Sequence, residues 1–232
     1  MPGGVQYRDR AVYLEPASTL VLADLHVGRD ATSDVAFPVG ERRDLTGRLE
    51  ALLAQFSPET VVFAGDVLHS FSEIPRETPE TLAALRRAVR EAGARLVVTP
   101  GNHDTMLASL WDGPTADAHR VGGDEGDTVV CHGHAVPDVN AARYVLGHDH
   151  PTITIEGRTH PCYLWGEHRG SEVLMLPAFT RLAAGVVINR MWASDFQSPF
   201  VTDANVLRPV VASESSDEVH EFPPLGEFRR LL

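Results

Sequence analysis

Five apolar runs along this chain each end in a short motif rich in aspartate, histidine and glycine, and this repeated pairing constrains the fold more than any other feature. The motifs, in chain order, are Asp24-Leu25-His26, Gly65-Asp66, Gly101-Asn102-His103-Asp104, Cys131-His132-Gly133-His134 and Gly147-His148-Asp149-His150. Polar residues that follow buried strands gather at the carboxyl edge of an open α/β sheet, where such sheets place their ligands. We therefore expect all five motifs to belong to one site.

The part of the chain before the third motif alternates between strand and helix signals. Short apolar runs predict strands at residues 12–14, 19–23, 61–64 and 95–99. Leucines at helical spacing predict an amphipathic helix over residues 41–56. A second helix is predicted with Thr78 as N-cap, Pro79 at the first helical position and a stop at Gly93. This alternation is typical of a parallel sheet.

The later part of the chain carries strand signals with few helical signals between them. Strands are predicted at residues 128–131, 143–146, 152–155, 162–164 and 173–176. A second sheet packed against the first would accommodate them. From Ser213 the chain turns polar and acidic before Pro223-Pro224, so we expect one domain over residues 1–212. The tail over residues 213–232 is expected to be flexible or to act as an interaction strand.

Length and composition indicate one globular unit. The 232 residues, 43% of them hydrophobic, allow one well-buried core but are short for two complete domains. No run approaches the roughly 20 apolar residues of a membrane span, and Met1-Pro2-Gly3-Gly4 does not open a signal peptide, so we expect a cytoplasmic location. Cys131 and Cys162 lack C-x-x-C spacing, and Cys131 is expected to be a buried core thiol.

The charge balance is unusual, because 32 acidic residues face 20 basic ones, the net charge is -12, and the chain contains no lysine. An acidic surface without ammonium groups resembles that of proteins from salt-loving archaea, while a GC-rich genome that encodes Arg for Lys is the alternative. At roughly 1 M salt the Debye length is about 3 Å, so surface repulsion is screened. The net charge therefore does not exclude a polyanionic substrate such as nucleic acid.

The ligand types in the motifs indicate divalent metal ions. Residues i and i+2 of a strand point the same way, so Asp24 and His26 can reach one ion together, as can His148 and His150. Mixed carboxylate and imidazole ligands suit manganese, iron or zinc better than magnesium or calcium, and nickel is a further alternative. Asp66 is the natural bridge between two ions about 3.5–4 Å apart, which would lower the pKa of a shared water.

The third motif combines a ligand with a proton donor. The side-chain carbonyl of Asn102 can bind a metal ion, while His103 can project over the substrate and donate a proton to the departing oxygen. Asp104 could hold the tautomer of His103. His69 follows Asp66 closely enough to line the same cleft, and Arg29 could meet a substrate phosphate, with ordinary surface charge as the alternative.

These motifs resemble the calcineurin-like metallophosphoesterase superfamily. Further segments resemble archaeal phosphoesterases related to the SbcD repair nuclease, and these segments are Ala23-Asp24-Leu25-His26-Val27-Gly28, His150-Pro151, Leu164-Trp165-Gly166-Glu167-His168-Arg169-Gly170, Leu176-Pro177-Ala178-Phe179 and Ser198-Pro199-Phe200. The resemblance implies an α/β (α+β) fold, a four-layer αββα sandwich of two mixed sheets flanked by helices.

The resemblance also implies roles for individual residues. It assigns Asp24, His26, Asp66 and His150 to a first metal ion, and Asp66, Asn102, His132 and His148 to a second. His103 would be the general acid. Since the ligand in such families immediately precedes glycine, His132 is preferred over His134 as the ligand.

Departures from the superfamily narrow the expected activity. Protein Ser/Thr phosphatases carry a downstream Asp-Arg after the Gly-Asp motif and Glu after Asn-His, whereas this chain has Val67-Leu68-His69-Ser70 and Asp104, so that activity is disfavoured. The repair nucleases carry a DNA-binding cap for which 232 residues leave no room.

We expect a dinuclear phosphodiesterase that cleaves a nucleotide or nucleic-acid ester by attack of a metal-bridged hydroxide. A small-molecule phosphomonoesterase and a non-catalytic metal-binding scaffold are the alternatives. The sequence leaves the oligomeric state open, a homodimer included.

Overall fold

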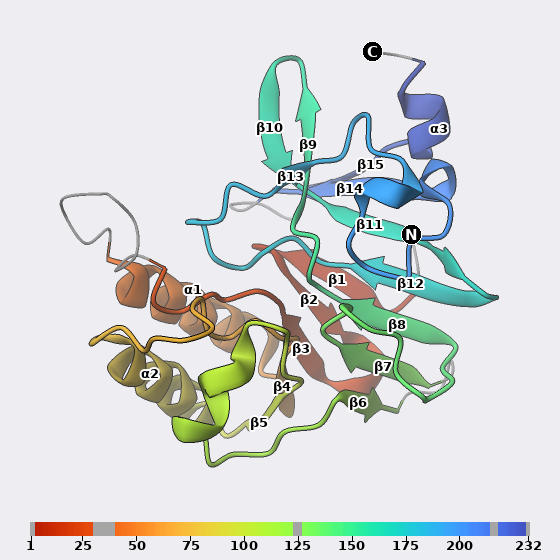
Figure 1. Ribbon diagram of the computed structural model, residues 1–232. Helices are drawn as coiled ribbons and strands as arrows, with labels where there is room; N and C mark the ends of the chain where they lie inside the picture. The colour runs from red at the N-terminus through yellow and green to blue at the C-terminus, as the bar shows by residue number, and fades with distance from the viewer. Residues whose placement is uncertain (1–2, 30–39, 123–126, 214–217, 231–232) are drawn as a thin grey trace.

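Two β-sheets pack face to face in the computed structural model of the protein, and two long helices cover the outer face of the first (Figure 1). The structure describes residues 3–29, 40–122, 127–213 and 218–230. The long helices are α1 (Glu41–Phe56) and α2 (Thr78–Glu91). Short helices are η1 (Glu15–Ala17), η3 (Asp104–Ser109), η4 (Ala193–Asp195), η5 (Ala204–Val206) and α3 (Leu225–Phe228).

The first sheet has five strands in chain order, β1 (Val5–Arg8), β2 (Ala11–Leu14), β3 (Thr19–Leu22), β4 (Thr60–Phe63) and β5 (Arg95–Val98). The first two pairings are antiparallel, while β3, β4 and β5 run parallel. Helix α1 connects β3 to β4 and α2 connects β4 to β5, as the alternating sequence pattern predicts. The carboxyl ends of the three parallel strands therefore meet at one edge.

The second sheet has seven strands in the order β15-β14-β11-β12-β8-β7-β6. They are β6 (Ala118–Val121), β7 (Thr128–Cys131), β8 (Arg143–Leu146), β11 (Tyr163–His168), β12 (Ser171–Met175), β14 (Arg208–Ala212) and β15 (Val219–Glu221). A small third sheet consists of β9 (Pro151–Ile155), β10 (Arg158–Pro161) and β13 (Val186–Val187). Strand β7 pairs parallel with β8, so the motifs that follow these two strands also share an edge.

Three separate cores show how the alternation of side chains along each strand builds the layers. On β3, Leu20 and Leu22 face the two long helices, while Val21 belongs to the core between the sheets. On β7, Val130 faces the first sheet, and Cys131 packs on the outer face of the second. Strand geometry demands this two-residue period. Cys131 is 2% exposed, which confirms the prediction of a buried core thiol.

The outer face of the second sheet is covered by short helices and loops, whereas long helices cover the first sheet. This outer layer consists of η5, α3 and the segments around Phe196 and Phe200, which pack against the outer side chains of the second sheet. The chain after the expected boundary at residue 212 contributes to it, because β15 pairs with β14 and Leu225 and Phe228 are buried. The division at residue 212 stays a prediction, but residues 218–230 are packed on the domain.

Helix boundaries agree with the sequence except at one cap. Helix α1 covers residues 41–56 as predicted. Helix α2 begins at Thr78, its N-cap is Glu77, and no side chain caps it. The predictions of Thr78 as N-cap and of Pro79 as the first helical residue are therefore each wrong by one residue. Among the described residues, none of the helices combines the length and the apolar character that a bilayer crossing requires.

Arg48 of α1 links the helix to two loops beside the carboxyl edge. Its side chain is 8% exposed. Nε donates to Asp9 Oδ2 at 2.7 Å, Nη1 donates to the Phe179 carbonyl at 2.7 Å, and the guanidinium lies 4.0 Å from the centre of the Phe179 ring. The adjacent Phe179 backbone N–H donates to the Ala23 carbonyl at 2.8 Å, directly before Asp24.

We expect Arg48→Met to lower the free energy of unfolding by about 3 kcal/mol, because it removes the closer of the two arginines that pair with the largely buried Asp9 carboxylate and leaves only Arg181, at 3.6 Å. The matched control is Arg42→Met, since Arg42 pairs with Glu80 through a side chain that is 49% exposed, and exposed pairs contribute at most about 1 kcal/mol. Urea unfolding followed by circular dichroism measures both. Equal effects of the two substitutions would contradict the role of Arg48.

Candidate active site

The expected ligands lie just beyond the strand ends, in backbone that has left the β conformation. Strand β3 ends at Leu22 and β4 at Phe63. The residues with positive φ include Asp24 (55°), His26 (47°), Asp66 (45°), His148 (79°) and His150 (47°). Non-glycine residues in this region cost about 1–3 kcal/mol each and cluster at functional sites. The prediction that these ligands alternate along a strand is therefore wrong, and local loop geometry aims them instead.

Backbone hydrogen bonds hold these loops in place. Asp24 N donates to Gly65 O at 3.1 Å and His26 N to Asp66 O at 2.8 Å, so the β3 and β4 segments stay paired beyond their strands. The Glu41 carboxylate at the start of α1 accepts from Gly28 N at 2.8 Å and from Arg29 N at 3.0 Å. The strained residues are thus fixed from both sides.

A first group of donors joins Asp24, His26, Asp66 and His150, whose ligand atoms lie within 4.8 Å of one another. The Nε2 atoms of His26 and His150 are 3.1 Å apart. His150 Nε2 is 3.3 Å from Asp24 Oδ1, and His26 Nε2 is 3.9 Å from Asp66 Oδ2. This is the set that the resemblance assigns to a first metal ion.

A second group joins Asp66, His132 and His148. His132 Nε2 lies 3.1 Å from His148 Nδ1, 3.4 Å from Asp66 Oδ1 and 3.1 Å from the Asn102 side-chain oxygen. Asp66 therefore belongs to both groups. His148 and His150 fall into different groups, so the expectation that these two reach one ion together is wrong.

The donor chemistry of both groups fits divalent metal ions. Imidazole nitrogens and carboxylate oxygens converge here, which suits first-row transition metals. His132 directs Nδ1 to the Ala64 carbonyl at 3.3 Å and so leaves Nε2 for the site, the outer contact that metal-binding histidines usually make. Gly101 leaves room for the Asp66 carboxylate, because a Cβ at position 101 would overlap it.

Burial and neighbouring charges set the protonation of the groups. Burial and the charge of Asp24 raise the pKa of Asp66 to about 8. Burial lowers the pKa of His26 to about 3 and of His148 to about 4. Burial disfavours charge on His150, but the contact with Asp24 outweighs it and raises the His150 pKa. Two adjacent buried carboxylates, with His26 and His148 neutral beside them, form a site that gains from a bound cation.

His103 lies beside these two groups, and together with His26 and His69 it forms a third set of convergent imidazoles. Its backbone N–H donates to Asp66 Oδ1 at 2.9 Å, and its Nε2 is 3.9 Å from Asp66 Oδ2. Nδ1 lies 2.8 Å from the His69 carbonyl, and since a carbonyl only accepts, Nδ1 carries a hydrogen. The ring centre of Phe71, a half-exposed residue, is 3.9 Å from that of His103.

Asp104 has a different role from the one expected. Its carboxylate accepts from the backbone N–H groups of Leu68 at 2.8 Å, Gly101 at 2.8 Å and Val67 at 3.2 Å. It therefore ties the loop after β4 to the loop after β5. The His103 tautomer is instead held by the His69 carbonyl, so the prediction that Asp104 holds it is wrong.

The expected substrate residues surround the donor groups at different depths. The His69 ring centre lies 5.5 Å from that of His26 and 6.2 Å from that of His103. Burial and the charge of Arg29 lower the His69 pKa. His134 is exposed, with its ring centre 5.3 Å from that of His132, and it lies outside the donor groups formed by the described residues.

Asp149 is a buried residue to which sequence reasoning assigned no role. It is 4% exposed between the two ligand histidines and accepts from Gln197 N at 2.8 Å and Ser198 N at 3.1 Å. Ser198 Oγ donates to the Gly133 carbonyl at 2.7 Å, beside His132. Asp149 thus links the two ligand loops of the second sheet, and its place inside the fifth motif was the available signal.

Comparisons with known proteins agree with this geometry. A family model described as calcineurin-like phosphoesterase matches residues 17–172. The fold is similar to nuclease MPE of Pseudomonas putida, with a TM-score of 0.61 and 26% identity over 88% of each chain. It is also similar to YfcE, a phosphoesterase from E. coli, with a TM-score of 0.48 and 16% identity over 89% of this chain and 98% of that one. A search of the curated proteins found no match.

The family match includes all five motifs in full and the residues of both donor groups. Two mixed sheets with buried Asp/His groups at their edge are the arrangement expected of a metal-dependent hydrolase of phosphoric esters. The chain therefore belongs to the calcineurin-like phosphoesterase family.

Proposed function

We propose that this protein is a phosphodiesterase that uses two divalent metal ions to cleave a phosphate ester of a nucleotide or nucleic acid. One observation carries the proposal, namely that the Asp66 carboxylate is shared by two donor groups directly beside His103. When bound, two such ions would activate a water and stabilise charge on the phosphoryl oxygens. We assign Asp24, His26, Asp66 and His150 to one ion, and Asp66, Asn102, His132 and His148 to the other.

His103 supplies the proton for the leaving oxygen in this proposal. Because Nδ1 already donates to the His69 carbonyl, the transferable proton of the charged ring is on Nε2, which faces Asp66. Phe71 covers one side of the ring and fixes its orientation. Proton donation of this kind typically contributes about 10²–10⁴-fold to the rate.

A diester of nucleic acid is favoured over a monoester by two observations. The nuclease of P. putida is similar to this chain, with a TM-score of 0.61 and 26% identity. Phe71 is 50% exposed beside His103, which offers an apolar ring next to the leaving group, where a nucleobase could stack. We also propose that Arg29, His69 and His134 face the substrate, because they lie near the donor groups.

Hydrolysis of bis-p-nitrophenyl phosphate tests this function. In Mn²⁺ we expect cleavage of the diester well above that of p-nitrophenyl phosphate, and loss of activity with EDTA. Assays should extend from dilute to concentrated KCl, where we expect activity to rise because the net charge of -12 is then screened. Preference for the monoester would favour the phosphomonoesterase, and no cleavage by a metal-loaded protein would favour the scaffold. No cleavage together with less than one bound ion per chain would contradict the enzyme.

We expect His103→Ala to lower turnover of the diester by about 10²–10⁴-fold while the content of bound metal stays unchanged. The reason is that His103 donates a proton and lies outside both ligand sets. His220→Ala, which alters an exposed histidine on β15, is the matched control and should leave turnover unchanged. Elemental analysis and steady-state kinetics measure the two quantities, and loss of metal from His103→Ala would contradict its role.

Metal binding should release protons at pH 7. Asp66, whose pKa is about 8 in the metal-free site, holds a proton there and must lose it to bind, while His26 and His148 are already neutral. With a contribution from His150, we expect about one proton or more per chain. Calorimetric titration with Mn²⁺ in buffers of different ionisation enthalpy measures the number. At pH 9 the release should fall, and equal release at both pH values would contradict the assignment.

Several finer features belong to the same proposal. We propose manganese as the native metal, with iron, zinc and nickel as alternatives, and membership of the SbcD-related subgroup of archaeal phosphoesterases. The lysine-free acidic composition supports a salt-loving source. A cytoplasmic location stays a prediction of the sequence, and a homodimer stays one alternative for the oligomeric state.

A further inference from the structure

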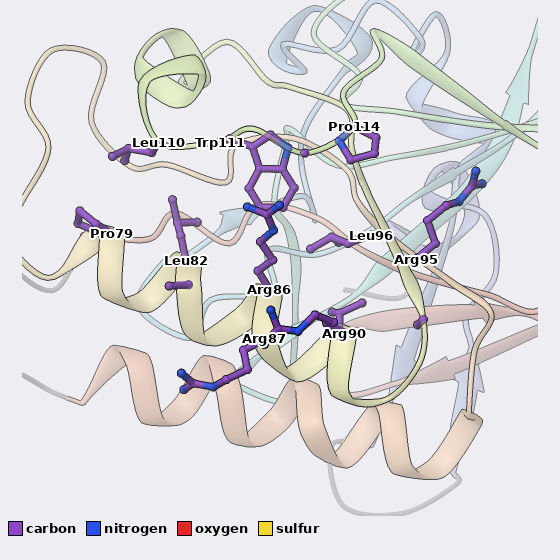
Figure 2. A pocket seen from close by; sticks show the side chains of 14 residues that line it. Pro79, Leu82, Arg86, Arg87, Arg90, Arg95, Leu96, Leu110, Trp111 and Pro114 are labelled. Atoms are coloured by element: carbon purple, nitrogen blue, oxygen red, sulfur yellow. The ribbon is translucent and has the colours of Figure 1, made fainter.

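A large surface pocket lies between α2, the start of β5 and the segment that follows η3 (Figure 2). Its volume is about 710 Å³. Four arginines line it, Arg86, Arg87 and Arg90 from α2 and Arg95 from β5, together with Trp111. None of the residues of the two donor groups lines this pocket, so it is a separate place on the molecule. We refer to it as the arginine pocket.

The charge of the arginine pocket opposes that of the whole chain. It gathers four of the 20 basic residues of a chain whose net charge is -12, and no acidic residue is among those that line it. Arg86 pairs with Asp112 at the rim. Arg87, Arg90 and Arg95 are exposed and form no ion pair with any residue in the described part of the chain.

This clustering is unfavourable for the isolated fold. Arg86 and Arg90 are one helical turn apart, and like charges at this spacing destabilise a helix by about 0.2–0.5 kcal/mol. Arg90 forms no ion pair among the described residues, and only the carboxyl end of α2, in whose last turn it lies, favours its charge. An anionic ligand would offset this charge more fully, because guanidinium groups pair with phosphate oxygens through two parallel hydrogen bonds.

The floor of the arginine pocket is apolar and carries one unused donor. Leu82, Leu96 and Leu110 line it beside Trp111. Figure 2 shows the Arg86 guanidinium beneath the indole, 5.3 Å from the ring centre. Trp111 is 9% exposed, and its Nε1 is buried without a hydrogen-bond partner among the described residues. A cationic rim over an apolar floor suits a ligand with phosphates and unpaired bases.

Helix η3 connects this pocket to the active site. The residue before it is His103, and the two residues after it are Leu110 and Trp111. Six residues of 3₁₀ helix span about 12 Å at roughly 2.0 Å per residue. A ligand that reaches both places must be longer than a mononucleotide, since each strand carries one phosphate per about 3.4 Å of axis.

We propose that the arginine pocket is an exosite that binds the backbone of a single-stranded nucleic acid whose scissile phosphate lies beside His103. The inference rests on the proposed phosphodiesterase function and specifies its substrate as a polymer. Arg90 on α2 and Arg95 on β5 each take a phosphate, while Arg86, which pairs with Asp112, borders the cationic track. Unpaired bases contact the apolar floor.

Binding of a fluorescein-labelled oligothymidylate of about 20 nucleotides, long enough to cover a typical single-strand site, tests the proposal. Fluorescence anisotropy is recorded in EDTA, so that no hydrolysis occurs. We expect Arg90→Glu/Arg95→Glu to weaken binding at least tenfold and to reduce the slope of log K against log salt by about 1.4, or about 0.7 for each lost phosphate contact. Cleavage of bis-p-nitrophenyl phosphate should stay unchanged.

The matched control is Arg158→Glu/Arg190→Glu, which makes the same change of charge at two exposed arginines outside the pocket. It should leave the affinity within about twofold, because neither arginine lines the pocket. Equal weakening by both double variants would overturn the exosite, because total charge would then explain the binding. Displacement of the oligonucleotide by polyglutamate at equal charge concentration would also overturn it, in favour of an acidic protein partner.

The two proposals fail in different ways. If no version of the protein cleaves bis-p-nitrophenyl phosphate, the phosphodiesterase function is contradicted, while the anisotropy assay still reports on the pocket. If cleavage occurs and Arg90→Glu/Arg95→Glu binds the oligonucleotide as tightly as the unaltered protein, only the exosite is contradicted.

Discussion

The carboxylate of Asp66 is the point on which the rest of the site depends. It belongs to both donor groups, it is buried, and it accepts the backbone N–H of His103 at 2.9 Å. Its neighbours are arranged to admit it, since Gly101 leaves the space that a side chain would fill. Its high proton affinity follows from burial beside Asp24. The fold thus holds a negative charge where only a cation or a proton can balance it.

Much of the fold follows from local sequence patterns. The long apolar periodicity of residues 41–56 gave the helix at its observed bounds, and continuous apolar runs located β3, β4 and β5. Strands such as β1, β10 and β15 escaped prediction, because they are short and rich in polar residues at sheet edges. Their pairing depends on partners distant in the chain, which no local pattern encodes.

The ligand identities could be read from the motifs, but their geometry could not. Asp24 and His26 were expected to alternate along a strand, whereas both adopt positive φ beyond its end. Nothing local shows that the β3 and β4 segments remain hydrogen-bonded there. Asp104 was misassigned for a similar reason, since its partners Val67 and Leu68 come from a loop 36 or 37 residues earlier in the chain. The roles of the site residues remain proposals that rest on this geometry.

The position of the donor groups between the two sheets has a consequence for the whole domain. Asp24 and Asp66 follow strands of the first sheet, while His132 and His148 follow strands of the second. A metal ion held by residues of both would join the sheets as a cross-link, in addition to the apolar core between them. The distance between the two sheets then sets the distance between the ligands. A larger side chain in the core between the sheets would therefore move the ligands apart and lower the rate of the reaction, although it contacts none of them.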